Sequence, residues 1–183
     1  LNWLQSIGGP ELVTTIPGNH DAYVRATRHR FAESWGDYLR GDDKREAFHF
    51  PSLRRRGPLA LISLCSAVPT PPFLATGTLG RVQRDALARL LEAVSADQAF
   101  RVLLVHHPLE SDSYIKRLTD AAELIAILRD HGVELILHGH DHVHSTIWVD
   151  GPNGKIPAIG VPSASAVKHG LHPDAAYNLF SIL

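Results

Sequence analysis

Apolar and polar positions follow two periods along the chain, one typical of strands and one typical of helices. Short β-branched or apolar runs bounded by Pro, Gly or charged residues predict strands. These runs are residues 12–16, 47–53, 59–66, 101–105, 133–137, 146–149 and 156–161, and residues 177–183 have the same character. Apolar positions three or four apart predict helices at residues 22–39, from residue 81 to residue 94, and at residues 120–131.

The order of these elements predicts the fold class. Between residues 101 and 137 a strand, a helix and a second strand follow one another, which indicates a right-handed parallel crossover. Asp120 is expected as the N-cap of that helix, with Glu123 completing a capping box, and Gly132 ends it. The remaining strands have hairpin-like neighbours. We therefore expect a mixed sheet in a single α/β domain over residues 1–183.

Two connecting segments have unusual compositions. Residues 67–80 are rich in Pro, Thr and Gly and predict a loop long enough to suggest a function. Residues 54–56 are three consecutive arginines between two predicted strands. They could bind phosphate, but no aromatic or Gly-rich partner accompanies them, so a solvated hairpin tip is the favoured interpretation.

Composition excludes several classes of protein. The 183 residues are 44% hydrophobic and 20% charged, which suits a globular domain and not a disordered chain. No apolar run reaches 18 residues, so we expect no membrane partner. A net charge of −1 argues against general nucleic-acid binding. The single cysteine, Cys65, cannot form an intrachain disulfide, and we expect a cytoplasmic protein.

Three motifs rich in His or Asn directly follow predicted strands, at residues 18–21, 106–108 and 139–142. Ligands of open α/β sheets bind at the carboxyl ends of the strands, where loops converge. We therefore expect the three motifs to meet in space.

The last motif indicates a metal site. In an extended segment His140 and His142 would point to the same side, and imidazole binds zinc, iron, manganese and nickel. The alternative is that such histidines only cover a sheet edge. Gly139 permits an unusual turn there, which favours the metal interpretation. For His138 and His144, packing or support of the ligands is the better interpretation.

The other two motifs add further donor groups. Only one of His106 and His107 can face the site, because adjacent side chains diverge, and the spacing does not choose between them. Asn19 offers a neutral oxygen ligand. His20 would lie near a metal but point elsewhere, which suits proton transfer or charge stabilisation. Asp21 could either orient an imidazole or cap the following helix.

In order and spacing, the segments 17–21, 106–108 and 139–142 resemble the last three of the five motifs of calcineurin-like metallophosphoesterases. The intervening segments most resemble the bacterial branch that includes class III cyclic-nucleotide phosphodiesterases. The resemblance implies an α/β fold, a mixed β-sheet sandwich flanked by helices. It also implies a hydrolase acting on a small phosphoester substrate, with nucleotides among the candidates.

The resemblance assigns roles residue by residue. Asn19, His106 and His140 would bind the second metal, and His142 would bind the first. His20 would be the catalytic histidine near the phosphate. Two divalent ions, of Mn, Fe, Zn or Ni, would hold a bridging hydroxide that attacks phosphorus.

The family's first two motifs, Asp-x-His and Gly-Asp-x-x-Asp, precede its Gly-Asn-His motif, and residues 1–17 contain no Asp or His. We therefore expect this chain to be part of a longer protein, without its N-terminal strands and most ligands of the first metal. Alone it should bind one metal weakly and hydrolyse phosphodiesters little. The alternatives are a non-catalytic metal-binding module and a phosphate-binding remnant of the fold.

Overall fold

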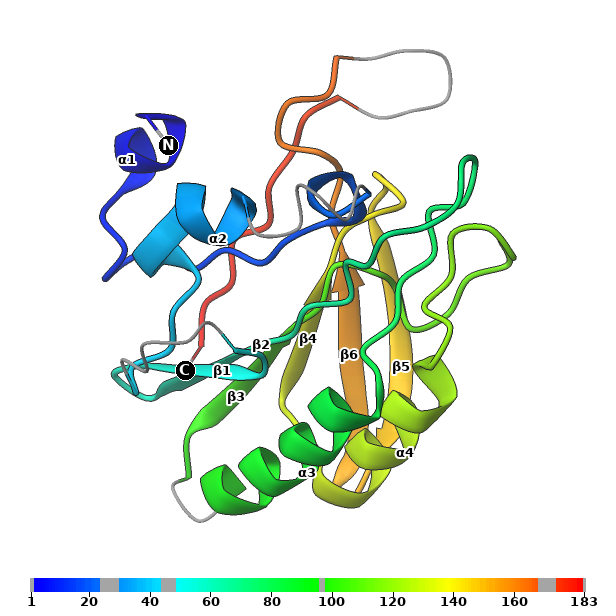
Figure 1. Ribbon diagram of the computed structural model, residues 1–183. Coiled ribbons are helices and arrows are strands. Elements are labelled where there is room, and N and C mark those ends of the chain that lie inside the picture. Colours follow the sequence, from blue (N-terminus) through cyan, green and yellow to red (C-terminus); the bar gives the residue numbers. More distant parts are fainter. Residues whose placement is uncertain (1, 24–29, 44–48, 96–97, 168–173, 183) are drawn as a thin grey trace.

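The computed structural model describes residues 2–23, 30–43, 49–95, 98–167 and 174–182. Its described strands form one mixed sheet in the order β1-β2-β3-β4-β6-β5 (Figure 1). The strands are β1 Ser52–Arg56, β2 Leu59–Ser63, β3 Phe100–Leu104, β4 Leu135–His138, β5 Ser145–Gly151 and β6 Gly154–Gly160. The four central strands are parallel and the two outer strands are antiparallel to their neighbours. The predicted mixed α/β sheet is confirmed.

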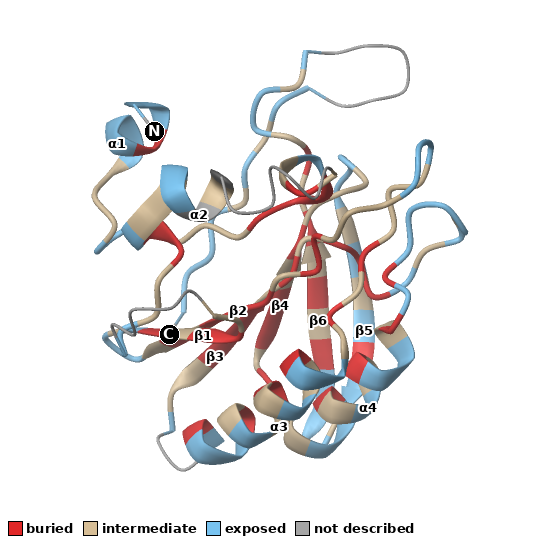
Figure 2. Ribbon diagram, viewed as in Figure 1, coloured by how far each residue is buried: buried red, intermediate tan, exposed pale blue. Residues whose placement is uncertain are grey.

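Two helices, α3 (Arg81–Ser95) and α4 (Ala121–His131), cover one face of this sheet (Figure 1). Their apolar stripes place leucines of both helices, such as Leu87 and Leu124, against Ile62, Leu103 and Ile136 of the central strands, and all five are fully buried. Burial of each such side chain stabilises the fold by roughly 2 kcal/mol. Figure 2 shows the buried residues concentrated in the strands and in the sheet-facing sides of α3 and α4.

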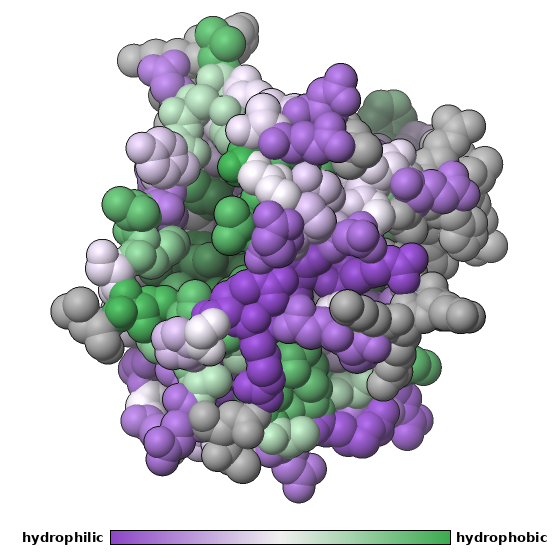
Figure 3. Space-filling view, turned by 90° about the vertical axis from the view of Figure 1, so that its left-hand side faces the viewer, coloured by the Kyte–Doolittle hydropathy of each residue, from purple (hydrophilic) through white to green (hydrophobic). Residues whose placement is uncertain are grey.

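The opposite face of the sheet is less well covered. Side chains alternate between the two faces of a strand, so Leu61, Leu104, Leu137 and Ile159 lie on the face away from α3 and α4. All four are only half-buried. Figure 3 shows hydrophobic side chains gathered in one hollowed area beside a hydrophilic band.

The remaining helical segments among the described residues are short. They are α1 (Asn2–Ile7), α2 (Arg30–Trp35) and the 3₁₀ turns η1 (Asn19–Asp21) and η3 (Gly36–Tyr38). Within the described part of residues 22–39, the predicted helix is present as α2 and η3, and residues 24–29 lie outside that part. In that described part, no helix is long and apolar enough to cross a membrane.

Two predicted strands are wrong. Residues 13–18 have no regular secondary structure. Residues 175–182 also have none, apart from a bend at residue 175. A buried guanidinium explains the first case. Arg54 donates to the carbonyls of Pro10 (2.6 Å) and Val13 (2.8 Å), so a side chain binds the carbonyls that a neighbouring strand would otherwise bind.

The prediction of a solvated turn at residues 54–56 is also wrong. All three arginines belong to β1, and the turn is formed by Gly57 and Pro58. The side chain of Arg54 is only 3% exposed, and it donates further hydrogen bonds to the carbonyls of Arg40 (2.6 Å) and Asp37. The guanidinium therefore joins the N-terminal segment to the sheet edge.

The N-terminus of α4 differs from the predicted capping box. Asp120 makes no side-chain cap to its own helix. Its carboxylate instead accepts hydrogen bonds from the backbone N–H groups of Leu79 (3.0 Å) and Gly80 (2.9 Å) and pairs with Arg84. The predicted C-terminus is confirmed, since Gly132 ends α4 with a φ of +69°.

Candidate metal centre

Side chains from all three motifs lie together beyond the carboxyl ends of β3 and β4. Asn19 Oδ1 is 2.9 Å from His106 Nε2, which is 3.3 Å from His140 Nδ1. In Figure 1 the dark blue turn η1 lies beside the yellow loop that follows β4. The structure thus brings Asn19, His106 and His140 together. That they bind a metal remains a prediction.

Local backbone geometry explains how Asn19 and His106 come so close. The N–H of Gly18 donates to the Asp21 carboxylate (2.8 Å), which closes the turn that presents Asn19. A Cβ atom on Gly18 would lie 2.8 Å from Cε1 of His106, so a glycine is needed for the imidazole to approach. Asp21 therefore closes the turn to which it belongs. Its alternative roles, as a cap of the following helix or a partner of an imidazole, stay predictions, because residues 24–29 lie outside the described part.

The last motif is not an extended segment, which corrects the argument from alternation. β4 ends at His138, and the backbone then turns, with φ of +70° at His140 and +58° at His142. The half-buried His140 turns toward His106, whereas His142 is exposed. Among the described residues, no hydrogen bond joins His142 to Asn19, His106 or His140. Its assignment to a first metal remains a prediction.

The electrostatics of the cluster keep both imidazoles neutral. Burial, and then the neighbouring histidines, lower the pKa of His106 to about 3. Burial also lowers the pKa of His140. Neutral imidazole nitrogens carry the lone pairs that metals bind. The Nε2 atom of His140 is buried and has no hydrogen-bond partner among the described residues.

The donor set fits a single divalent cation in part. Ligand atoms about 2.0–2.1 Å from one ion lie roughly 3 Å from each other. His106 Nε2 has this separation from both Asn19 Oδ1 and His140 Nδ1. The amide of Asn19 is oriented for this role, because its Nδ2 donates to the hydroxyl of Tyr23 (2.5 Å) and leaves Oδ1 toward His106. Within the described ranges, no group of three or more His, Cys, Asp or Glu side chains is placed to hold a metal. The set of one Asn and two His is therefore incomplete by itself.

His107 is the residue whose position the sequence left open. It is fully buried, with Nε2 donating to the carbonyl of Ala75 (3.1 Å). A carbonyl only accepts, so Nδ1 carries no proton and accepts from the hydroxyl of Ser66 (2.7 Å). Burial lowers the pKa of His107 to about 4. His106 thus faces the cluster, and His107 anchors the loop at residues 67–80.

The other histidines differ in their surroundings. His20 is exposed, and its ring lies 4.9 Å from that of Tyr23, outside the cluster. His138 is buried, and a Cβ atom on Gly160 would lie 2.7 Å from its ring, so its role is packing, as expected. His144 is exposed.

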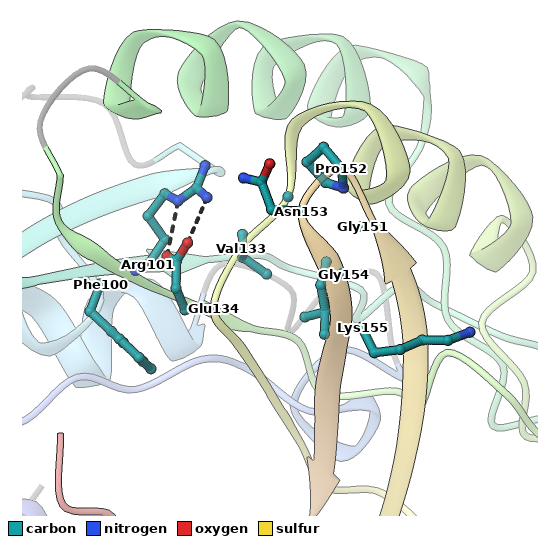
Figure 4. A pocket seen from close by; sticks show the side chains of 11 residues that line it. Phe100, Arg101, Val133, Glu134, Gly151, Pro152, Asn153, Gly154 and Lys155 are labelled. Atoms are coloured by element: carbon teal, nitrogen blue, oxygen red, sulfur yellow. Dashed lines mark hydrogen bonds and ion pairs between the residues drawn. The ribbon is translucent and has the colours of Figure 1, made fainter. Parts of the chain in front are cut away.

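A separate pocket of about 320 Å³ lies at the opposite end of the sheet (Figure 4). Arg101 and Glu134 form an ion pair there (2.7 Å), and Arg101 also donates to the carbonyl of His131 (3.1 Å). Lys155 pairs with Asp150 (2.5 Å). The charged side chains that line this pocket are therefore all paired, and their contacts support the fold.

A family model described as calcineurin-like phosphoesterase matches residues 2–144, a range that contains all three motifs. The chain therefore belongs to the calcineurin-like phosphoesterase family. Members of this family generally use divalent metal ions to hydrolyse phosphoesters. No curated protein is similar enough to the chain to count as a match.

Proposed function

We propose that the chain is a metal-dependent phosphodiesterase for small phosphodiesters, nucleotides among them, and that Asn19, His106 and His140 hold one divalent cation. The supporting observation is the approach of three donor atoms, at 2.9 and 3.3 Å, from segments far apart in the sequence. Both imidazoles have lowered pKa values and are neutral at pH 7.

A bound cation would offset negative charge on the phosphoryl oxygens. The protein groups orient this centre. Tyr23 fixes the amide of Asn19, and the absence of a side chain at Gly18 leaves space for the ring of His106. His20 is exposed beside Tyr23, and we assign to it the protonation of the leaving oxygen of a bound ester. Protonation of that oxygen accelerates such reactions by about 10²–10⁴-fold.

A dinuclear centre is a further part of the proposal. Its bridging carboxylate would come from an Asp-x-His and a Gly-Asp-x-x-Asp motif, and residues 1–17 contain neither Asp nor His. His142 would then bind the first metal. For the chain as given, we propose one cation and slow hydrolysis.

Hydrolysis of bis(p-nitrophenyl) phosphate with added Mn²⁺ tests this proposal. His106→Ala should abolish the metal-dependent rate, and His20→Ala should lower kcat by about 10²–10⁴-fold while the affinity for Mn²⁺ is kept. His144→Ala is the matched control, because His144 is exposed and lies outside the cluster. A metal-dependent rate that survives in His106→Ala would refute the proposal.

A second candidate is a non-catalytic metal- or phosphate-binding protein of the same fold. One observation favours it, since the described cluster of Asn19, His106 and His140 includes no carboxylate. Stoichiometric Mn²⁺ binding with no hydrolysis of any phosphodiester would select this candidate.

A further inference from the structure

A pocket of about 480 Å³ lies beside the candidate metal centre and has no part in the proposal above. Tyr23 forms one wall, and the continuous segment 70–75 forms the rest. This segment belongs to the Pro-rich loop at residues 67–80. Loops next to a catalytic centre commonly contact the substrate.

Both walls are attached to residues of the three motifs. The hydroxyl of Tyr23 accepts from Asn19 (2.5 Å), and the carbonyl of Ala75 accepts from His107 (3.1 Å). The ring of His107 in turn lies 4.4 Å from that of His140. Two hydrogen bonds therefore connect the pocket walls to residues of the motifs.

The walls are chemically suited to an uncharged, flat group. None of the lining residues carries a charged side chain. The hydroxyl of Thr70 already donates to the carbonyl of Leu74 (2.6 Å), and the N–H of Leu74 donates to the carbonyl of Pro71 (3.1 Å). The remaining contact surfaces are apolar or aromatic: Pro71, Pro72, Phe73, Leu74, Ala75 and the Tyr23 ring. Aromatic rings pack well against such surfaces, and a sugar or a charged group would lose its hydrogen bonds with water.

We infer that this pocket binds a planar aromatic substituent of the phosphoester, a nucleobase or an aryl group. The inference rests on the proposed function, because that function places the phosphoryl group next to Tyr23. It identifies the substrate class through the ring that is recognised.

Equilibrium binding separates this inference from catalysis. Phenylphosphonate and methylphosphonate share a phosphoryl group and differ in the ring, so calorimetry in the presence of Mn²⁺ measures the contribution of the ring alone. Phenylphosphonate should bind at least tenfold more tightly. Leu74→Asp should bring the ratio of the two dissociation constants toward one. Pro72→Asp, at an exposed wall position, should do the same without disturbing the core.

Val82→Asp is the matched control. Val82 is 85% exposed on α3, away from the pocket, so it places the same charge at a neutral site. The affinity ratio should be unchanged in this variant. A ratio near one in the native chain, failure of both phosphonates to bind, or a native ratio in folded Leu74→Asp and Pro72→Asp would each overturn the inference.

The same assay separates the two sources of the ring. Adenosine 5′-monophosphate against ribose 5-phosphate reports recognition of a base, and the phenyl pair reports recognition of any aryl ring. Tighter binding of adenosine 5′-monophosphate than of ribose 5-phosphate would indicate a nucleotide substrate. A preference seen only in the phenyl pair would indicate an aryl ester. Ring preference without hydrolysis would leave the pocket in place and refute the proposed function. Hydrolysis without ring preference would refute the inference about the pocket and leave the proposed function in place.

Discussion

The carboxylate of Asp120 joins the N-terminal ends of the two helices that cover the sheet, and its removal should destabilise the protein strongly. Asp120 is only 5% exposed. It accepts hydrogen bonds from the N–H groups of Leu79 (3.0 Å) and Gly80 (2.9 Å) and forms an ion pair with Arg84. Asp120→Ala leaves these three partners without an acceptor.

The magnitude follows from the groups left unpaired. A buried donor without a partner costs about 1–3 kcal/mol. Loss of one member of a buried ion pair costs about 3–5 kcal/mol. The Arg84 side chain is 18% exposed and can still reach water, so we expect Asp120→Ala to lower the free energy of unfolding by about 3–5 kcal/mol in total. Asp120→Asn keeps an acceptor oxygen but loses the charge, so its cost should be about 2 kcal/mol.

The pH dependence gives an independent check. Burial raises the pKa of Asp120. The hydrogen bonds from Leu79 and Gly80 and the pairing with Arg84 together lower the pKa by more than burial raises it, so the net pKa lies below 3.8. A lowered folded-state pKa means that the carboxylate stabilises the fold above pH 3.8 and less as the pH falls through the folded-state value. The difference between the native chain and Asp120→Asn should therefore narrow below about pH 4.

Urea unfolding followed by circular dichroism measures both effects. Arg84→Met in the Asp120→Ala background should cost less than Arg84→Met alone, because the two residues are coupled. A loss below about 1 kcal/mol in Asp120→Ala at pH 7 would refute the reasoning, since even one buried donor left unpaired costs about 1 kcal/mol or more.

Three further predictions concern other parts of the protein. Gly18→Ala should weaken Mn²⁺ binding at least tenfold by calorimetry, because its Cβ would lie 2.8 Å from the ring of His106; an unchanged affinity would contradict the arrangement. Arg54→Met should lower the free energy of unfolding by about 3–5 kcal/mol in urea, because several carbonyls lose their donor and each unpaired buried group costs about 1–3 kcal/mol. A loss below about 1 kcal/mol would show that water replaces the guanidinium. Burial raises the pKa of Glu134, but Arg101 lowers it by more, so the net pKa lies below 4.5. The stabilisation from this ion pair is therefore lost as the pH falls through that lowered pKa. Glu134→Gln should flatten that dependence in acid unfolding curves, and an unaltered curve would argue against it.

The sheet and its helices were largely predictable because their signals are local. The leucine stripe that starts near Leu87 and the apolar strand before His106 are each set by residues next to one another. The strand predicted at residues 12–16 was wrong because Arg54, some forty residues later, binds the carbonyls of that segment. Asp120 likewise binds backbone groups about forty residues earlier rather than its own helix. Tertiary contacts of this kind override local propensity and leave no local signal.

The location of the candidate site could be predicted from the sequence, but the orientations of its histidine side chains could be predicted only in part. That the motifs meet follows from their position after strands, and the 2.9 Å approach of Asn19 and His106 confirms it. The choice between His106 and His107 depends on Ser66 and Ala75, which lie far away in the sequence. The separation of His140 from His142 depends on left-handed backbone conformations that a strand-based argument excludes.

Calorimetric titration of the purified chain with Mn²⁺ tests the central claim most directly. We expect one cation per chain, with at least tenfold weaker binding in each of Asn19→Ala, His106→Ala and His140→Ala and native affinity in His144→Ala. Binding that survives the loss of all three side chains, or two tightly bound cations per chain, would contradict it.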